Sequence, residues 1–236
     1  MRIIHAKNKE EMSKIAAQIF IEQVTNKPDS LLGLATGGTP VGLYDELGKS
    51  GCDFSRVTSV NLDEYAGLTG ENENSYRYFM NDNLFRKINI KLENTNVPCG
   101  TAEDLHAECK RYSALLNKLG TRDIQLLGIG PNGHIGFCEP DDELFATCSV
   151  VDLTESTIQA NARFYNDISE VPRQALSMGV KEIMDAKHIV LIAEGAGKKE
   201  ILKKACFGKI TTQVPASLLQ LHPNVTVIEA TGLEEE

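Results

Sequence analysis

One short stretch of the chain, Leu126–Pro140, carries three polar side chains that could move protons: Asn132, His134 and Glu139. A histidine near a carboxylate and an amide can accept and donate a proton near neutral pH. The stretch continues an apolar run at 124–129 that is typical of a buried strand. An active-site loop is favoured over a glycine-rich turn with a structural histidine, because open parallel sheets bind ligands beyond the carboxyl ends of their strands.

A second loop, Thr36–Pro40, has the composition of an anion cradle. It reads Thr-Gly-Gly-Thr-Pro, follows a predicted strand at 30–35, and leads into a helix that we expect to begin near Pro40. Free backbone N–H groups and the helix dipole attract a phosphate at such a place. The alternative is an ordinary tight turn capped by Thr39. The candidate phosphate-binding residues of this loop are Thr36, Gly37, Gly38 and Thr39.

Charged residues follow two further predicted strands. Asp63 and Glu64 end the third predicted strand, and could be helix caps or solvated loop charges. Lys198 lies in the expected first turn of a helix, where a cation opposes the helix dipole. A local conflict of this kind is expected at a functional site. For its neighbour Lys199 we keep the interpretation of a solvated surface lysine.

Strands and helices alternate along the chain, which predicts an α/β fold. This is a Rossmann-like, mostly parallel sheet with helices on both faces, in a single domain over 1–236. The four loops should then meet at one edge of the sheet. Residues 141–167 fit less well, and form either a lid over the site or a surface excursion. The expected strands are 2–6, 30–35, 57–62, 95–99, 124–129, 188–193 and 224–229, with 148–153 as a further candidate. The expected helices cover 9–24, 75–86, 104–119 and 216–221, and two more begin near 40 and 196.

Composition excludes several classes of protein. The net charge of −9 and the pI near 5.2 argue against a nucleic-acid partner, although a small anionic substrate needs only a few local cations. The six cysteines have no CxxC spacing, so no metal site is expected. No apolar run is long enough for a membrane span or a signal peptide. We therefore expect a cytoplasmic protein with reduced thiols.

Taken together, these loops resemble the glucosamine-6-phosphate deaminase family. The resemblance extends over nearly the whole chain in the family's order, and jointly the motifs are highly specific. It implies a Rossmann-like fold and conversion of glucosamine 6-phosphate and water to fructose 6-phosphate and ammonium, without a metal or an organic cofactor. The matching stretches are 35–40, 61–65, 74–76, 128–140, 160–164 and 219–223.

Carried over by position, the resemblance implies a role for each candidate residue. Asp63 would move the proton between C2 and C1 of the sugar. His134 would open the sugar ring, with Glu139 orienting the imidazole and Asn132 in its hydrogen-bonding network. The phosphate would be held by the Thr36–Thr39 loop together with two cations, Arg163 and Lys198.

The chain departs from the family pattern at positions that bear on its regulation, and related functions are possible alternatives. Many members have aspartate in place of Asn132 and asparagine in place of Cys138, and the hexameric allosteric members carry basic residues where this chain reads 146–150. We therefore expect a monomer or small homo-oligomer without allosteric activation. Two rival interpretations are a 6-phosphogluconolactonase-like hydrolase and a non-catalytic sugar-phosphate-binding regulator. The lactonases typically follow the histidine with Thr-Ala-Ser, where this chain has Ile135–Phe137.

Overall fold

The computed structural model describes residues 1–154, 158–159 and 167–233, and these contain a seven-stranded parallel sheet. Its strand order is β1-β10-β9-β6-β2-β3-β5, and every pairing between neighbours is parallel. The prediction of a mostly parallel sheet is confirmed. The strands are β1 (Arg2–His5), β2 (Leu31–Leu34), β3 (Thr58–Asn61), β5 (Thr95–Asn96), β6 (Ile124–Leu127), β9 (Ile189–Glu194) and β10 (Val225–Ala230).

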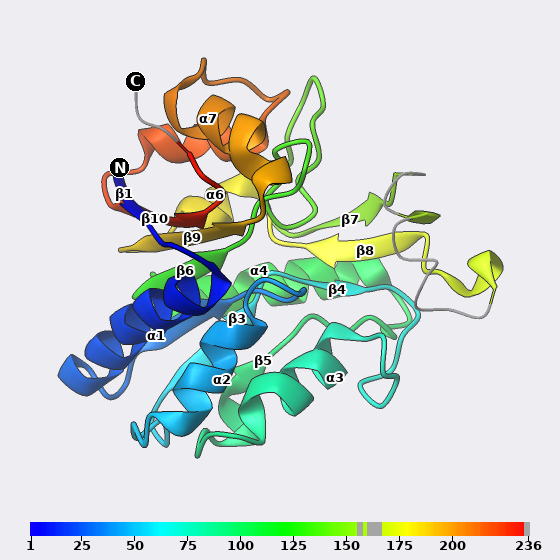
Figure 1. The fold of residues 1–236 in the computed structure, drawn as a ribbon. Coiled ribbons are helices and arrows are strands. Elements are labelled where there is room, and N and C mark those ends of the chain that lie inside the picture. Colours follow the sequence, from blue (N-terminus) through cyan, green and yellow to red (C-terminus); the bar gives the residue numbers. More distant parts are fainter. Residues whose placement is uncertain (155–157, 160–166, 234–236) are drawn as a thin grey trace.

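Helices cover both faces of this sheet (Figure 1). The connections through α1, α2 and α3 step one way across the sheet, and those through α4, α6 and α7 step back. Because parallel crossovers are right-handed, the two sets lie on opposite faces. The helices are α1 (Lys9–Asn26), α2 (Val41–Lys49), α3 (Tyr76–Met80), α4 (Leu105–Leu119), α6 (Val180–Met184) and α7 (Lys199–Phe207). A π-helical turn (Asn81–Phe85) continues α3, and 3-10 turns lie at Leu92–Asn94, Ile168–Glu170, Ala196–Lys198 and Pro215–Leu221.

The central strands form because their apolar side chains are buried on both faces. All residues of β2 and β6 are buried, as strands between two helix layers require. The helices around them begin at side-chain caps: Asn8 accepts a hydrogen bond from the Glu11 amide at α1, and Asp104 accepts one from the Ala107 amide at α4. The loops at the sheet edge are therefore anchored to a rigid core.

A second, three-stranded antiparallel sheet is the main feature that the sequence did not predict. It consists of β4 (Asp63–Tyr65), β8 (Gln174–Ser177) and β7 (Ser149–Asp152), in the order β4-β8-β7. The candidate strand at 148–153 is thus present, but in this small sheet. Residues 63–65 are a short strand rather than the loop that we expected.

The order of the large sheet places a crevice between β2 and β6. These strands are neighbours, yet the chain leaves β2 towards α2 on one face and leaves β6 towards the opposite face. Such a point of reversal is where open α/β sheets bind their ligands. The loops that follow β2 and β6 are the two glycine-rich loops singled out in the sequence.

The proposed lid at 141–167 falls partly outside the described residues. Its described portion includes β7, which pairs with β8 along all four of its residues. Residues 155–157 and 160–166, including Arg163, are outside the described part of the chain. Among the helices that the structure describes, none combines the length and apolar character of a membrane span.

Candidate active site

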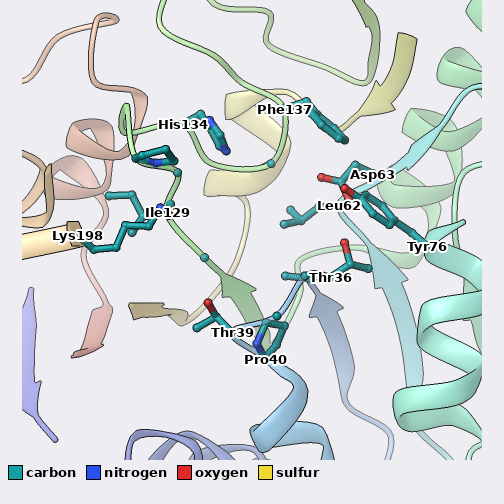
Figure 2. Close-up of a pocket in the computed structure, with 17 residues that line it drawn as sticks. Thr36, Thr39, Pro40, Leu62, Asp63, Tyr76, Ile129, His134, Phe137 and Lys198 are labelled. Carbon is teal, nitrogen blue, oxygen red and sulfur yellow. Dashed lines mark hydrogen bonds between the residues drawn. The ribbon is translucent and has the colours of Figure 1, made fainter. Parts of the chain in front are cut away.

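A cavity of about 400 Å³ opens at the carboxyl edge of the parallel sheet. It is lined by the loop after β2, by the end of β3 and the start of β4, by the loop after β6, and by Tyr76 and Lys198. Figure 2 shows Lys198 and Asp63 on opposite sides of the cavity, with Thr36 and Thr39 along a third side. The structure therefore brings together the candidate residues of the four separate loops.

The Thr36–Thr39 loop has the geometry of an anion cradle. Gly37 has φ of +97°, which favours glycine, and a Cβ atom at Gly37 or Gly38 would meet nothing within 4 Å. Helix α2 begins directly afterwards, and its N-cap, Pro40, provides no side-chain hydrogen bond. The Thr39-capped turn considered as an alternative is thus not what the structure shows. The first amides of α2 remain available to an anion.

Lys198 reaches the cavity from the turn that precedes α7. Its Nζ donates a hydrogen bond to the carbonyl of Ile129, 2.8 Å away, at the end of the run that continues β6. Burial lowers the pKa of Lys198, and no carboxylate among the described residues forms an ion pair with it. A partly desolvated ammonium without a counter-ion favours binding of an anion.

Asp63 is the most strongly perturbed acid of the cavity. Its side chain is buried, and no described residue donates a hydrogen bond to its carboxylate. Burial, followed by the nearby charge of Glu64, raises the pKa of Asp63 to about 8. A Cβ atom at Gly136 would lie 3.7 Å from Asp63 Oδ2, so the loop after β6 passes close to the carboxylate. A carboxylate with such a raised pKa is a strong base when it is ionised.

His134, Glu139 and Asn132 form a connected group on the loop after β6. Nδ1 of His134 lies 3.0 Å from Oε1 of Glu139. The other carboxylate oxygen of Glu139 accepts a hydrogen bond of 2.5 Å from Nδ2 of Asn132, and the amide oxygen of Asn132 accepts one from the His134 backbone. Asn132 thus orients Glu139, which in turn contacts the imidazole.

Glycine is needed where the imidazole packs on its own loop. A Cβ atom at Gly130 would collide with the ring of His134. The Gly130 amide also donates a hydrogen bond to the His134 carbonyl, 2.9 Å away, which closes the loop. Gly130 therefore lets the imidazole of His134 pack against its own loop.

Two residues that line the cavity had no role in the sequence interpretation. Tyr76 and Phe137 line the cavity beside Asp63, with their rings stacked at 6.2 Å between centroids (Figure 2). Glu64, which the sequence left as a possible cap or solvated charge, is buried, with its carboxylate bound to backbone amides. Tyr76 follows Ser75, which the sequence did predict as a helix cap and which the structure confirms as the cap of α3. That cap was the one signal that could have placed Tyr76 at the start of a helix near the site.

These features define an α/β protein with an acid–base site beside an anion cradle, at the reversal point of a parallel sheet. Among the described residues, no group of three or more His, Cys, Asp or Glu side chains is arranged to hold a metal. The chain belongs to the family of glucosamine-6-phosphate isomerases and 6-phosphogluconolactonases, whose sequence model matches residues 7–228.

Close relatives share almost the full length of the chain. It is 57% identical over 232 residues to the glucosamine-6-phosphate deaminase of Lachnoclostridium phytofermentans, covering 97% of this chain and 98% of that protein. It is 53% identical to the enzyme of the same name from Clostridium perfringens strain SM101, covering 97% and 96%.

Solved structures agree with this family assignment. A monomeric glucosamine-6-phosphate deaminase superposes with a TM-score of 0.95 at 46% identity, covering 99% of this chain and all of that one. The 6-phosphogluconolactonase of Trypanosoma brucei has a TM-score of 0.76 at 17% identity, covering 98% and 96%, which shows a shared fold alone.

Proposed function

We propose that this protein is a glucosamine-6-phosphate deaminase, which converts glucosamine 6-phosphate and water to fructose 6-phosphate and ammonium. One observation carries the proposal: a buried base, Asp63, and a histidine–carboxylate pair, His134 and Glu139, share one cavity with an anion cradle. The names and full-length similarity of the relatives support the choice of substrate. The whole chain acts as one catalytic domain in amino-sugar catabolism in the cytoplasm, as a monomer or small homo-oligomer.

The phosphate of the substrate binds at the start of α2. In this proposal the backbone amides of Gly37, Gly38 and Thr39 and the hydroxyls of Thr36 and Thr39 donate hydrogen bonds to the anion, and Lys198, which also lines the cavity, adds a positive charge. Arg163, which lies outside the described residues, completes this set by the resemblance to the family. Hydrogen bonds to the phosphate compensate the Lys198 ammonium for the hydrogen bonds to water that it loses on burial.

Ring opening is carried out by His134. The imidazole takes the proton of the anomeric hydroxyl and delivers one to the ring oxygen, so the C1–O5 bond breaks and the open-chain aldehyde forms. The contact of Nδ1 with Glu139 holds the ring in one orientation, and the hydrogen bond from Asn132 holds Glu139. Because Glu139 holds the imidazole and Asn132 holds Glu139, the other ring nitrogen of His134 stays available to the sugar.

Deamination follows from proton transfer by Asp63. Its carboxylate removes the C2 proton, and the electrons of that bond form a double bond between C1 and C2. The aldehyde oxygen takes a proton from the ammonium group of the substrate, which gives an enol amine, and Asp63 then returns the C2 proton at C1. The product is the imine at C2, and attack of water replaces the nitrogen by oxygen, so that ammonia leaves as ammonium and a ketone remains. A base with a raised pKa suits the abstraction of a carbon-bound proton, because proton affinity rises with the pKa of the base.

The test is product analysis with purified protein. Ammonium and fructose 6-phosphate should appear in equal amounts from glucosamine 6-phosphate, with and without chelator, while 6-phosphogluconolactone is hydrolysed no faster than in buffer. Lys199→Ala, a change outside the lining of the cavity, provides an active control. Lactone hydrolysis without ammonium release would overturn the proposal, and so would binding of glucosamine 6-phosphate without any turnover.

A further inference from the structure

Glu64 is a buried acid that the reaction above does not use. Its carboxylate accepts three hydrogen bonds from backbone amides: from Tyr65 at 2.9 Å, from Tyr76 at 2.8 Å and from Arg77 at 2.9 Å. Only 2% of the residue is exposed, and it does not line the cavity. Hydrogen bonds from several amides favour the charged form of a carboxylate and hold it in one position.

These bonds join the strand that carries the base to the helix that forms the cavity wall. Asp63 and Glu64 are neighbours on β4, so their side chains point to opposite sides of the strand. Asp63 faces the cavity, and Glu64 faces the first turn of α3, where it binds the amides of Tyr76 and Arg77. The ring of Tyr76 is thereby fixed beside Asp63.

Glu64 is also distinguished by its charge. The charge of Asp63 in turn acts on four titratable groups of the elements packed around it: two on α2 and α4, one on α3 and one on the loop after β6. Burial raises the pKa of each of them, so all are neutral between pH 6 and pH 9. They are Tyr44, Tyr112, Tyr76 and Cys138.

Burial raises the pKa of Glu64 itself to about 6, against the amides and the charge of Arg77, so above that pH it is ionised. The guanidinium of Arg77 is bound to Thr95, and it is not among the groups that shift the pKa of Asp63. Within the described part of the chain, Glu64 is thus the charged group that acts on Asp63 in the neutral range.

We propose that Glu64 is a positioning residue of this site, which ties β4 to α3 and provides the negative charge against which Asp63 works as a base. The inference rests on the proposed deaminase function. A fixed like charge makes the proton of a neighbouring buried acid harder to remove, and makes the ionised acid a stronger base. Glu64 itself touches no substrate.

The experiment compares the pH profile of kcat/KM for deamination in four proteins: wild type, E64Q, E64D and S75A. The acidic limb of this profile reports groups of the free enzyme that must be ionised. E64Q removes the charge and should move the limb to lower pH by on the order of one unit, with a lower kcat. E64D keeps the charge and should leave the limb in place.

S75A is the matched control for loosening of α3. Ser75 caps the same helix by accepting a hydrogen bond from the Tyr78 amide, and it carries no charge. It should lower kcat without moving the limb. The inference would be overturned if the acidic limb of E64Q had the same position as that of the wild type. It would also be overturned if the limb moved as far in S75A as in E64Q.

Two further outcomes are decided by the same set of proteins. Where E64Q does not fold, E64D decides the question, because a displaced limb in E64D refutes the charge role and an unmoved one supports it. A wild-type protein that releases no ammonium refutes the proposed function instead. The two failures are therefore distinguishable.

Discussion

The buried carboxyl of Asp63 should cost the fold stability at alkaline pH, and Asp63→Asn should remove this cost. Burial, followed by the charge of Glu64, raises the pKa of Asp63 from 3.8 to about 8. In this pH window the folded protein binds a proton that the unfolded chain releases. The free energy of unfolding therefore falls as the pH rises through the window, and above it the ionised carboxylate is held at a cost.

The size of the effect follows from the shift. One pKa unit corresponds to about 1.4 kcal/mol, so the three units between pH 5 and pH 8 contribute at most about 4 kcal/mol. Water penetration and relaxation around the charge reduce this upper limit. We expect Asp63→Asn to gain about 2–4 kcal/mol relative to the wild type on going from pH 5 to pH 9, whatever its stability at pH 5.

The assay is urea unfolding of both proteins at pH 5 and pH 9. Asp123→Asn is the matched control, because Asp123 is also buried but is bound by Lys27, Lys187 and the Leu31 amide. Burial opposes the charge of Asp123, yet these partners outweigh it and lower its pKa. The ionised Asp123 carboxylate stops stabilising the fold only in acid. The loss of stability in Asp123→Asn relative to the wild type should therefore be equal at pH 5 and pH 9.

The result that refutes this reasoning is a difference between Asp63→Asn and wild type that is the same at pH 5 and pH 9. The Asp63 carboxyl would then be ionised in the folded protein throughout this range, and its burial would not make it a strong base. The same variant should bind substrate but lose both turnover and exchange of the C2 hydrogen with deuterated solvent, which activity and NMR measurements check. Retained exchange would assign the base to another group.

Three further predictions concern the phosphate, the histidine network and regulation. Lys198→Ala removes a charge-assisted hydrogen bond of roughly 1.5–3 kcal/mol and should raise KM about tenfold to a hundredfold, whereas an equal rise in Lys199→Ala would exclude a specific role. Asn132→Asp places a second carboxylate against Glu139, so the group of His134, Glu139 and residue 132 should retain a proton to higher pH. The acidic limb of the pH profile of kcat/KM should then move to higher pH. An unmoved limb would show that Asn132 and Glu139 are uncoupled. Initial rates should be hyperbolic in substrate, and a sigmoidal curve abolished by N-acetylglucosamine 6-phosphate would contradict the expected absence of allosteric activation.

The parallel sheet was predictable because several of its strands are short, mostly apolar runs. Strands such as β2 and β9 are buried on both faces, and their apolar runs reflect that burial. The helix caps were equally local signals, as at Asn8, Ser75 and Asp104. Boundaries were less accurate. The helix predicted for 216–221 is a 3-10 turn at Pro215–Leu221, and the helix predicted for 75–86 changes to a π-helical turn at Asn81.

The small antiparallel sheet could not be predicted in this way. Its strand β4 is three residues long and contains two acids, so it shows neither an apolar run nor alternation. It exists because β8, more than a hundred residues later, pairs with it from Tyr65↔Ala175 to Asp63↔Ser177. No local pattern records such a partner. The burial of Asp63 and Glu64 follows from that pairing, which is why solvated charges remained a valid alternative from the sequence.

The site shows the same division between local and long-range information. The contact of His134 with Glu139 lies within one loop, and residue types with close spacing were enough to suggest it. The hydrogen bond of Asn132 goes to Glu139 rather than to the imidazole, which is a matter of side-chain direction and not of spacing. Arg163 stays a prediction, because it lies outside the described residues.

The two sheets divide the proposed reaction between them. The parallel sheet carries the loops after β2 and β6, which bind the anion and open the ring, whereas the base stands on β4 of the antiparallel sheet. The strength of that base depends first on burial and then on the charge of Glu64, and both depend on the packing of α3 against β4. Packing that keeps water from a carboxylate makes it a better base and a worse contributor to stability at the same time. In this protein a residue that costs the fold stability is therefore expected to be one that the chemistry needs.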